Sequence, residues 1–306
     1  MIYPKFLNNN STIIVTSPSS GVGDKILDYE KSINTLIKEG YKVLETPSVR
    51  NNSIVSNTPL IRSKELNDSL NSDSDLILIA RGGEFLLECF PYLELDNIIN
   101  KQKWVMGYSD PTSILFSITT KYDIATIYGF NSTSYDESHL CIKNNLDIIS
   151  GLNIVQSNFD TLDIISNKNE FNTSGRLIGG CIEVLNELAG LSIHDIDKFN
   201  NKYASDGIIW YFDIYEMNSN EFYRTLLHLK YLGWFKNVKG IMLSKINNKI
   251  EDYYTYNEVL EKVFPNIPYV SDVPIGHVFP RFTLINGSII DINYKNNSIN
   301  IEFRLD

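Results

Sequence analysis

A strand-turn-helix pattern at residues 103–128 constrains the fold of this chain more than any other stretch. It begins with a short apolar run at 104–106, passes through a sharp turn that ends at Pro111, and continues with apolar residues at helical spacing. In this context a serine such as Ser109 can be held out from the end of a sheet. Its hydroxyl is then exposed, and the first backbone N–H groups of the helix lie nearby.

The same alternation of strand and helix recurs over the first 150 residues. Apolar runs and stretches with helical periodicity follow one another at 12–16, 28–40, 41–45, 63–72 and 75–80. This rhythm predicts a parallel sheet with helices on both faces. Ligand sites in such sheets gather at the carboxyl ends of the strands, where Gly83 and Ser109 fall.

The pattern weakens at residues 151–174, which we expect to link an N-terminal domain (1–150) to a C-terminal domain (175–306). In the second domain we expect buried strands at 207–212 and 240–243, and antiparallel pairs through 283–285, 288–292 and 298–303. The predicted class is therefore α/β. It combines a parallel-sheet N-terminal domain with helices on both faces and a mixed α/β C-terminal domain rich in β-strands.

Charge and composition exclude several classes of protein. The 306 residues carry a formal net charge of -10 and no cluster of Lys and Arg, so neither nucleic acid nor a membrane surface is an expected partner. Three cysteines without C-x-x-C spacing predict neither a disulfide framework nor a zinc site, and we expect no metal and no other cofactor. No run approaches the ~18–20 apolar residues of a membrane span, and the start lacks a signal-peptide pattern. We expect a cytoplasmic protein.

Several polar residues could carry chemistry, and each has a plainer alternative. His277 follows a glycine in an irregular loop, where a histidine is a better candidate for a general base than one in a helix, and the alternative is a histidine bonded structurally within its loop. Asp213 ends the run 207–212, where a carboxylate could orient an imidazolium or simply cap the next segment. Glu216 is near enough in sequence to compete with it. Ser109 could be a nucleophile or only a helix cap.

A glycine pair follows the buried run 75–80. The N–H of Gly83, which no side chain covers, could approach a substrate oxygen. Together with the N–H of Asp110 it would form an oxyanion hole. A simple tight turn is the alternative, and the neighbouring Glu84 could either contact substrate or stay solvated.

Taken together, these segments resemble the serine-peptidase family of L,D-carboxypeptidases (muramoyl-tetrapeptide carboxypeptidases), which also contains the microcin C self-immunity peptidases. The matching motifs occur in order over nearly the whole chain. They are S-P-S-S-G at 17–21, R-G-G-E at 81–84, G-Y-S-D-P-T at 107–112, Y-G at 128–129, G-R-L-I-G-G at 175–180, G-I-I-W at 207–210, L-G-W-F at 232–235, V-K-G at 238–240 and I-G-H at 275–277.

The resemblance implies a Ser–Glu–His triad split between the two domains, with Ser109 as the nucleophile and His277 as the base. The family's strand usually ends in glutamate, whereas alignment places Asp213 there, which is shorter by roughly 1.5 Å of reach. We therefore expect a shifted backbone, a water-bridged Asp–His bond or reduced activity. Glu216 is the fallback acid.

The implied reaction removes the terminal D-alanine from an L,D-linked cytoplasmic muropeptide through an acyl-enzyme, as in peptidoglycan recycling. The expected partner is thus a small peptide substrate, and the family implies a homodimer. An exopeptidase of this kind needs a cation for the terminal carboxylate. Arg81, Arg176 and Arg281 are candidates by location, although each could equally form a structural ion pair.

Other functions remain open, although we favour muropeptide cleavage. The chain could be a microcin C-type immunity peptidase that cleaves a peptidyl-nucleotide, with Phe159 or Phe171 stacking on adenine. It could also be a non-catalytic binding or immunity protein with a degraded triad, which the departure at Asp213 keeps open. A conventional α/β-hydrolase is disfavoured because Pro111 replaces the second glycine of the G-x-S-x-G turn.

Overall fold

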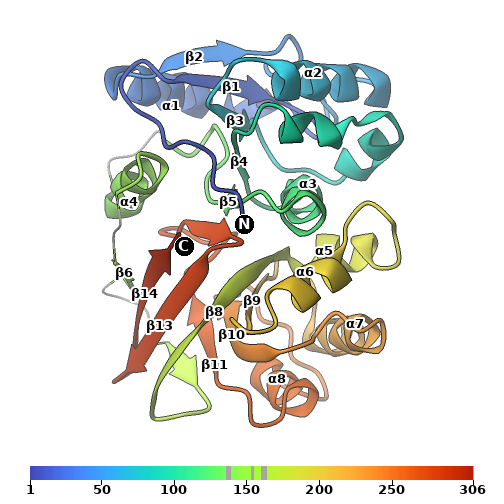
Figure 1. Ribbon diagram of the computed structural model, residues 1–306, viewed down its shortest axis with the longest axis vertical. Coiled ribbons are helices and arrows are strands. Elements are labelled where there is room, and N and C mark those ends of the chain that lie inside the picture. The colour runs from blue at the N-terminus through green and yellow to red at the C-terminus, as the bar shows by residue number, and fades with distance from the viewer. Residues whose placement is uncertain (136–138, 153–154, 160–163, 306) are drawn as a thin grey trace.

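The computed structural model describes residues 1–135, 139–152, 155–159 and 164–305, and two sheets lie one above the other in it (Figure 1). Within the described residues the N-terminal sheet has six strands in the order β12-β5-β4-β3-β1-β2. They are β1 (Thr12–Thr16), β2 (Lys42–Glu45), β3 (Leu76–Ile79), β4 (Trp104–Gly107), β5 (Thr126–Tyr128) and β12 (Leu284–Asn286). The first five pair in parallel, as the strand-helix rhythm predicts.

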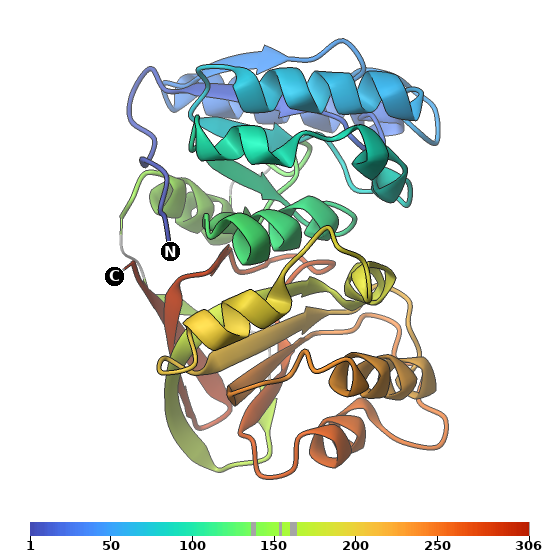
Figure 2. The same ribbon diagram turned by 45° about the vertical axis from the view of Figure 1, so that its right-hand side comes forward.

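Helices cover both faces of this sheet, and Figure 2 shows α2 in front of it and α1 behind it. The helices of this half are α1 (Ile26–Lys38), α2 (Pro59–Asn71), α3 (Thr112–Ser117) and α4 (Leu140–Ile149). Shorter turns of 3₁₀-helix lie at Gly23–Lys25, Leu86–Tyr92 and Leu95–Ile99, and a π-helical turn at Ile118–Tyr122. Every residue of β3 and β4 is buried, which explains their continuous apolar sequences.

The C-terminal sheet mixes parallel and antiparallel strands, in the order β6-β14-β13-β8-β9-β10-β11-β7 within the described residues. They are β6 (Gln156–Ser157), β7 (Ile165–Ser166), β8 (Glu170–Cys181), β9 (Ile208–Asp213), β10 (Val238–Ser244), β11 (Tyr269–Val273), β13 (Ile289–Lys295) and β14 (Ser298–Arg304). The helices are α5 (Ile182–Leu188), α6 (Ile196–Lys202), α7 (Ser219–Tyr231) and α8 (Tyr256–Val263). The predicted α/β class, with a strand-rich second half, is confirmed.

Two segments differ in detail from the sequence expectation. Residues 151–174, expected as a linker, contain β6, β7 and the first residues of β8, while 153–154 and 160–163 lie outside the described part. In the tail, β13 and β14 pair with each other as predicted, but β12 pairs antiparallel with β5 of the other sheet. This strand covers an edge of the N-terminal sheet that would otherwise expose unpaired N–H and C=O groups.

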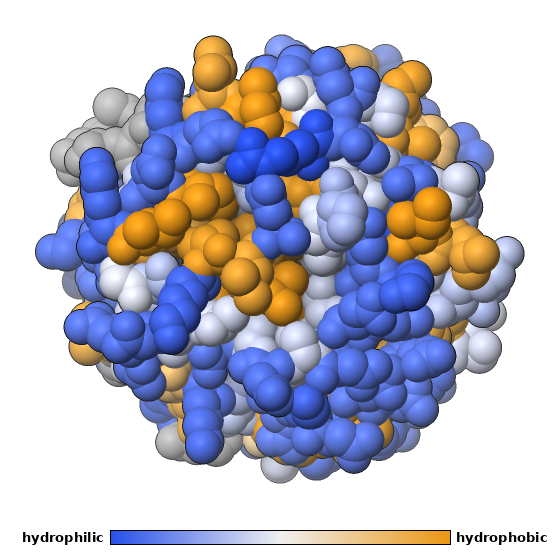
Figure 3. Space-filling view, turned by 90° about the horizontal axis from the view of Figure 1, so that it is seen from above, coloured by the Kyte–Doolittle hydropathy of each residue, from blue (hydrophilic) through white to orange (hydrophobic). Residues whose placement is uncertain are grey.

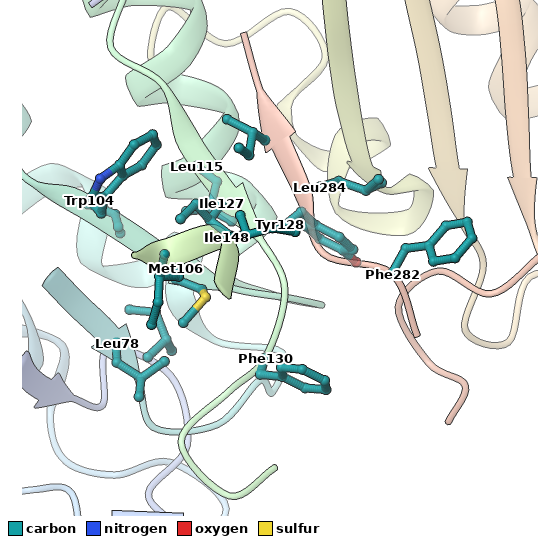
Figure 4. Close-up of a cluster of buried hydrophobic side chains, with 14 of the residues drawn as sticks. Leu78, Trp104, Met106, Leu115, Ile127, Tyr128, Phe130, Ile148, Phe282 and Leu284 are labelled. Carbon is teal, nitrogen blue, oxygen red and sulfur yellow. The ribbon is translucent and has the colours of Figure 1, made fainter. Parts of the chain in front are cut away.

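The apolar core is continuous between the two sheets. It includes β3 to β5 on one side and Ile209, Tyr211 and Ile290 on the other. Figure 4 shows Tyr128 of β5 pointing from this core toward Phe282 and Leu284 of the C-terminal half. The end of β5 is thereby packed against the second half of the chain.

The surface of the N-terminal half at its β2 edge is mixed in character. Seen from above, apolar groups are interspersed with hydrophilic ones (Figure 3). Leu44 of β2 and Ile37 of α1 are among the exposed apolar side chains of this half. Among the residues that the structure describes, no helix combines the length and the apolar character needed to cross a bilayer.

Candidate active site

Three side chains far apart in the sequence form a chain of hydrogen bonds where the two sheets meet. Ser109 Oγ lies 3.0 Å from His277 Nε2, and His277 Nδ1 lies 2.8 Å from Asp213 Oδ2. Ser109 follows β4, Asp213 ends β9, and His277 lies in the loop after β11. A hydroxyl bonded in this way can pass its proton to the imidazole, while the carboxylate fixes the ring's tautomer and orientation.

Ser109 sits in a sharp turn with a strained backbone. Its φ is 73°, in the left-handed region that residues with a side chain rarely adopt. The turn packs closely against its neighbours, since a Cβ on Gly82 would lie 3.0 Å from Ser109 Cβ. The Thr112 N–H bonds to the Ser109 carbonyl at 2.8 Å, so the chain enters α3 directly after this residue. Strain of this kind is characteristic of residues held in position for function.

Asp213 reaches the imidazole directly despite its short side chain. The loop before His277 passes so close that a Cβ on Gly276, where φ is 67°, would lie 1.9 Å from Asp213 Oδ2. Only glycine allows this approach. The backbone N–H of His277 also donates to Asp213 Oδ1 at 3.3 Å. The bond between Asp213 and His277 is therefore direct and not water-bridged.

Tyr128 connects both ends of this arrangement, and sequence reasoning missed it. The Ser109 N–H donates to its hydroxyl oxygen at 3.2 Å, and the hydroxyl donates to Asp213 Oδ2 at 2.6 Å. Complete burial raises the pKa of Tyr128 well above its ordinary value, so the phenol stays protonated and acts as a donor. In the sequence it is the last residue of a short apolar strand, where a tyrosine is expected to be core.

His277 is held between two aromatic rings. Tyr108 packs edge-on at 5.4 Å between ring centroids, and Tyr215 lies at 4.7 Å with a 38° tilt. Burial lowers the pKa of His277, but the charge of Asp213 and its hydrogen bond outweigh burial and leave the pKa above its ordinary value. The ring can thus accept a proton readily.

Glu183 fixes the loop that follows Asp213. Its Oε1 accepts the backbone N–H groups of Tyr215, Glu216 and Met217 at 3.0–3.1 Å. These partners lie 32 to 34 residues further along the chain, so nothing local in the sequence signals the contact. Glu216, the fallback acid, lines the cavity beside His277, but the bond to Nδ1 comes from Asp213.

The two backbone groups expected to form an oxyanion hole are held together by the Asp110 side chain. Its buried carboxylate accepts hydrogen bonds from Ser19 Oγ and from the Leu86 N–H, so it ties the loop carrying Gly83 to the start of α3. Burial raises the pKa of Asp110. Within the described residues no backbone hydrogen bond occupies the N–H of Gly83 or of Asp110.

The three arginines expected as carboxylate binders lie in different environments. Arg81 pairs with Asp24 at 2.8 Å on the surface. Arg176 makes a two-pronged ion pair with Asp206. On β8, Arg176 lies five residues before the position that pairs with Asp213. Measured along the strands, it is therefore about 16 Å away from Asp213. Of the three, Arg281 alone lines the same cavity as His277.

A cavity of about 330 Å³ opens beside His277, and Arg281, Lys245 and Tyr108 contribute to its lining. The aromatic residues considered for adenine stacking pack elsewhere: Phe171 against Tyr294, and Phe159 against Phe282. Glu84 is exposed. The described residues contain no group of three or more His, Cys, Asp or Glu side chains placed to hold a metal ion.

Comparison with known families matches both halves of the chain. The LD-carboxypeptidase N-terminal domain matches residues 13–129, and the LD-carboxypeptidase C-terminal domain matches residues 174–292. A Rickettsia conorii protein named as a carboxypeptidase is 24% identical over 249 residues, covering 79% of this chain and 75% of that protein. The microcin C7 self-immunity protein of Escherichia coli is 30% identical over 101 residues, 32% of this chain and 29% of that protein.

Solved structures share the fold over nearly the whole chain. The muramoyltetrapeptide carboxypeptidase of Oxalobacter formigenes superposes with a TM-score of 0.79 at 19% identity, over 96% of this chain and 98% of that one. A protein from Bacillus anthracis that resembles the microcin immunity protein gives a TM-score of 0.83 at 22% identity, over 99% of both chains. At these identities the likeness establishes the common fold.

Proposed function

Because this chain belongs to the LD-carboxypeptidase family, we propose that it is a serine carboxypeptidase that removes the terminal D-alanine from an L,D-linked muropeptide in the cytoplasm. The observation that carries the proposal is the unbroken set of hydrogen bonds from Ser109 through His277 to Asp213. A degraded site in a binding protein has no need to keep both bonds at normal length.

In the proposed mechanism His277 takes the proton of Ser109 as the Oγ attacks the scissile amide carbonyl. The N–H groups of Gly83 and Asp110 bind the oxyanion of the tetrahedral intermediate. His277 then gives the proton to the leaving nitrogen, and an acyl-enzyme forms on Ser109. Water, deprotonated by His277, attacks the ester and regenerates the serine, while Asp213 stabilises the imidazolium at both stages.

The proposal is tested by incubating the purified protein with a muramoyl-tetrapeptide that ends in D-alanine and measuring released alanine by mass spectrometry. We expect release by the wild type and none by Ser109→Ala at equal thermal stability. A tetrapeptide ending in L-alanine is the matched control and should be cleaved far more slowly. Release by Ser109→Ala at the wild-type rate would remove this residue from the mechanism.

A second substrate class is supported by the likeness to the microcin C7 self-immunity protein. In this case the same residues would cleave a peptidyl-nucleotide, and the leaving group would be the nucleotide portion with its nitrogen. Cleavage of such a conjugate without alanine release from the tetrapeptide would favour this alternative. The family resemblance also suggests a homodimer, which light scattering on the purified protein would measure.

A further inference from the structure

Arg281 is a buried cation that has no anionic partner among the described residues. Its side chain is only 8% exposed, and no residue in the described ranges offers a hydrogen-bond partner to its Nε or Nη1 atom. No ion pair with Arg281 occurs in the part of the chain that the structure describes. Buried arginines are normally paired, because removing a charge from water is costly unless a partner replaces the water. An arginine in this state has hydrogen-bonding capacity that a ligand can use.

Aromatic rings hold the guanidinium in place. Its Cζ lies 4.3 Å from the ring centroid of Tyr108 and 5.2 Å from that of Phe130. These contacts stabilise the cation through the faces of the rings and leave its N–H groups free for a planar anion. The position of the charge is therefore fixed before any ligand arrives.

The ring of Tyr108 contacts both Arg281 and the proposed base, His277. Tyr108 packs against His277 at 5.4 Å and against the guanidinium at 4.3 Å, so the two groups lie within about 10 Å, the sum of these distances. His277 and Arg281 both belong to the loop after β11, and both line the cavity of about 330 Å³. Lys245 adds a second positive charge to this lining, and Glu216 adds one negative charge.

The chemistry of the leaving group indicates what this cavity binds. His277 must give a proton to the leaving nitrogen, so the leaving residue lies on the His277 side of the scissile bond. In a carboxypeptidase that residue carries its free carboxylate two bonds away from this nitrogen. A carboxylate so placed enters the cavity that Arg281 lines, and a carboxylate is the planar anion that a guanidinium binds with two hydrogen bonds.

We propose that Arg281 binds the anion of the leaving group, and that the cavity beside Tyr108 is the leaving-group subsite. The inference rests on the proposed function and deepens it, because it says which substrates the Ser109 site selects. The anion is the carboxylate of a terminal amino acid or, in a peptidyl-nucleotide, the phosphate-derived anion. In both cases substrates with a neutral leaving group are discriminated against.

The experiment compares two tetrapeptides that differ only at the end, one with a free D-alanine carboxylate and one with D-alaninamide. We expect the wild type to prefer the free acid in kcat/KM by about 100-fold, the usual size of a charge-assisted hydrogen-bond pair. Arg281→Met should reduce this preference to less than about tenfold, mostly by slowing cleavage of the acid. Arg281→Lys should restore only part of it, because a lysine lacks the planar fork that stacks between the rings.

Lys249→Met is the matched control. Lys249 follows Asn248, which lines the cavity, but its charge pairs with Asp272 at 3.0 Å. This variant should keep the wild-type preference for the acid. The preference for the free acid can also be measured as the Kd values of the two tetrapeptides, with each variant combined with Ser109→Ala. The test then does not depend on turnover.

Thermal stability separates a binding role from a structural one. Arg281→Met removes a buried charge that no anion of the described part of the chain compensates, so its Tm should be equal to that of the wild type or higher. A preference for the acid that survives in Arg281→Met, or a large drop in its Tm, would overturn the inference. If the inference fails, labelling of Ser109 by a fluorophosphonate in Arg281→Met shows whether the proposed function still holds.

A peptidyl-nucleotide and its analogue with an uncharged linker identify the source of the anion. If the wild type prefers the charged conjugate and Arg281→Met loses this preference, Arg281 binds the phosphate-derived anion. If only the peptide acid shows the effect, the ligand is a carboxylate. If neither pair shows a preference that depends on Arg281, the subsite assignment is wrong.

Discussion

The hydroxyl of Tyr128 donates a 2.6 Å hydrogen bond to Oδ2 of Asp213, 85 residues further along the chain. The same hydroxyl accepts the N–H of Ser109 at 3.2 Å. One side chain of the N-terminal sheet therefore connects the backbone of the proposed nucleophile with the carboxylate at the end of β9. The geometry of the site depends on how the two sheets are joined at this point.

Tyr128→Phe should lower kcat by about tenfold or more with little change in KM, because it removes a hydrogen bond to a charged group worth about 1.5–3 kcal/mol. The steady-state parameters with the D-alanine tetrapeptide measure this split. Tyr211→Phe is the control, since its hydroxyl bonds to Asn286 at 2.9 Å in the same core and not to Ser109 or Asp213. Equal kinetic losses in the two variants would mean that Tyr128 acts through stability alone.

Asp213→Glu should be harmful although glutamate is usual at this position in the family. The extra methylene moves the carboxylate by roughly 1.5 Å, into space that the Gly276 backbone already borders. We expect a loss of about 100-fold in kcat/KM from misplacement of this size, and about 10⁴-fold for Asp213→Asn. Glu216→Gln should retain activity. Wild-type activity in Asp213→Glu would contradict the packing argument, and loss of activity in Glu216→Gln would return the acid role to Glu216.

The pH profile should reflect the raised pKa of His277. A protonated imidazole cannot accept the Ser109 proton, so kcat/KM falls as the pH drops through the pKa of the free enzyme. Because Asp213 raises this pKa, the acid limb should have its midpoint above 6.5. In Asp213→Asn burial still lowers the pKa while the carboxylate charge is absent, so the midpoint should move to lower pH. NMR titration of the His277 ring checks both values, and an unshifted midpoint would contradict the assignment.

Gly83→Ala should disable the proposed oxyanion hole. The added Cβ would lie 2.4 Å from Ser19 Oγ, and φ at this residue is +152°. Because the N–H must then move, kcat should fall by about 100-fold, the usual cost of one oxyanion donor. Gly190→Ala is a matched control, since φ there is +83° and no atom lies within 4 Å of the added Cβ. It should lose some stability and no kcat.

The sequence predicts the strand-helix order of the N-terminal half because each apolar run and each glycine stop is local. It also allows Ser109, Asp213 and His277 to be picked out, through their motifs and their places at strand ends and in a loop. These three side chains do come together, 168 residues apart in the case of Ser109 and His277. The roles proposed for them remain predictions.

Contacts without a local signal could not be predicted. From the sequence, Arg176 and Arg281 are equally good candidates for binding a carboxylate. Only the fold shows that Asp206 pairs with Arg176 while aromatic rings surround Arg281. Tyr128 looks like an ordinary core residue in a short strand. The pairing of β12 with β5 depends on which sheet edge the tail reaches, and the apolar pattern of three residues does not specify this.

The central claim is that His277 activates Ser109, and labelling with a fluorophosphonate measures this most directly. After reaction and digestion, mass spectrometry should find the label on the peptide that contains Ser109. His277→Ala should label at least 100-fold more slowly, as expected for loss of the base. Label on a different serine, or equal labelling of His277→Ala and the wild type, would contradict the account.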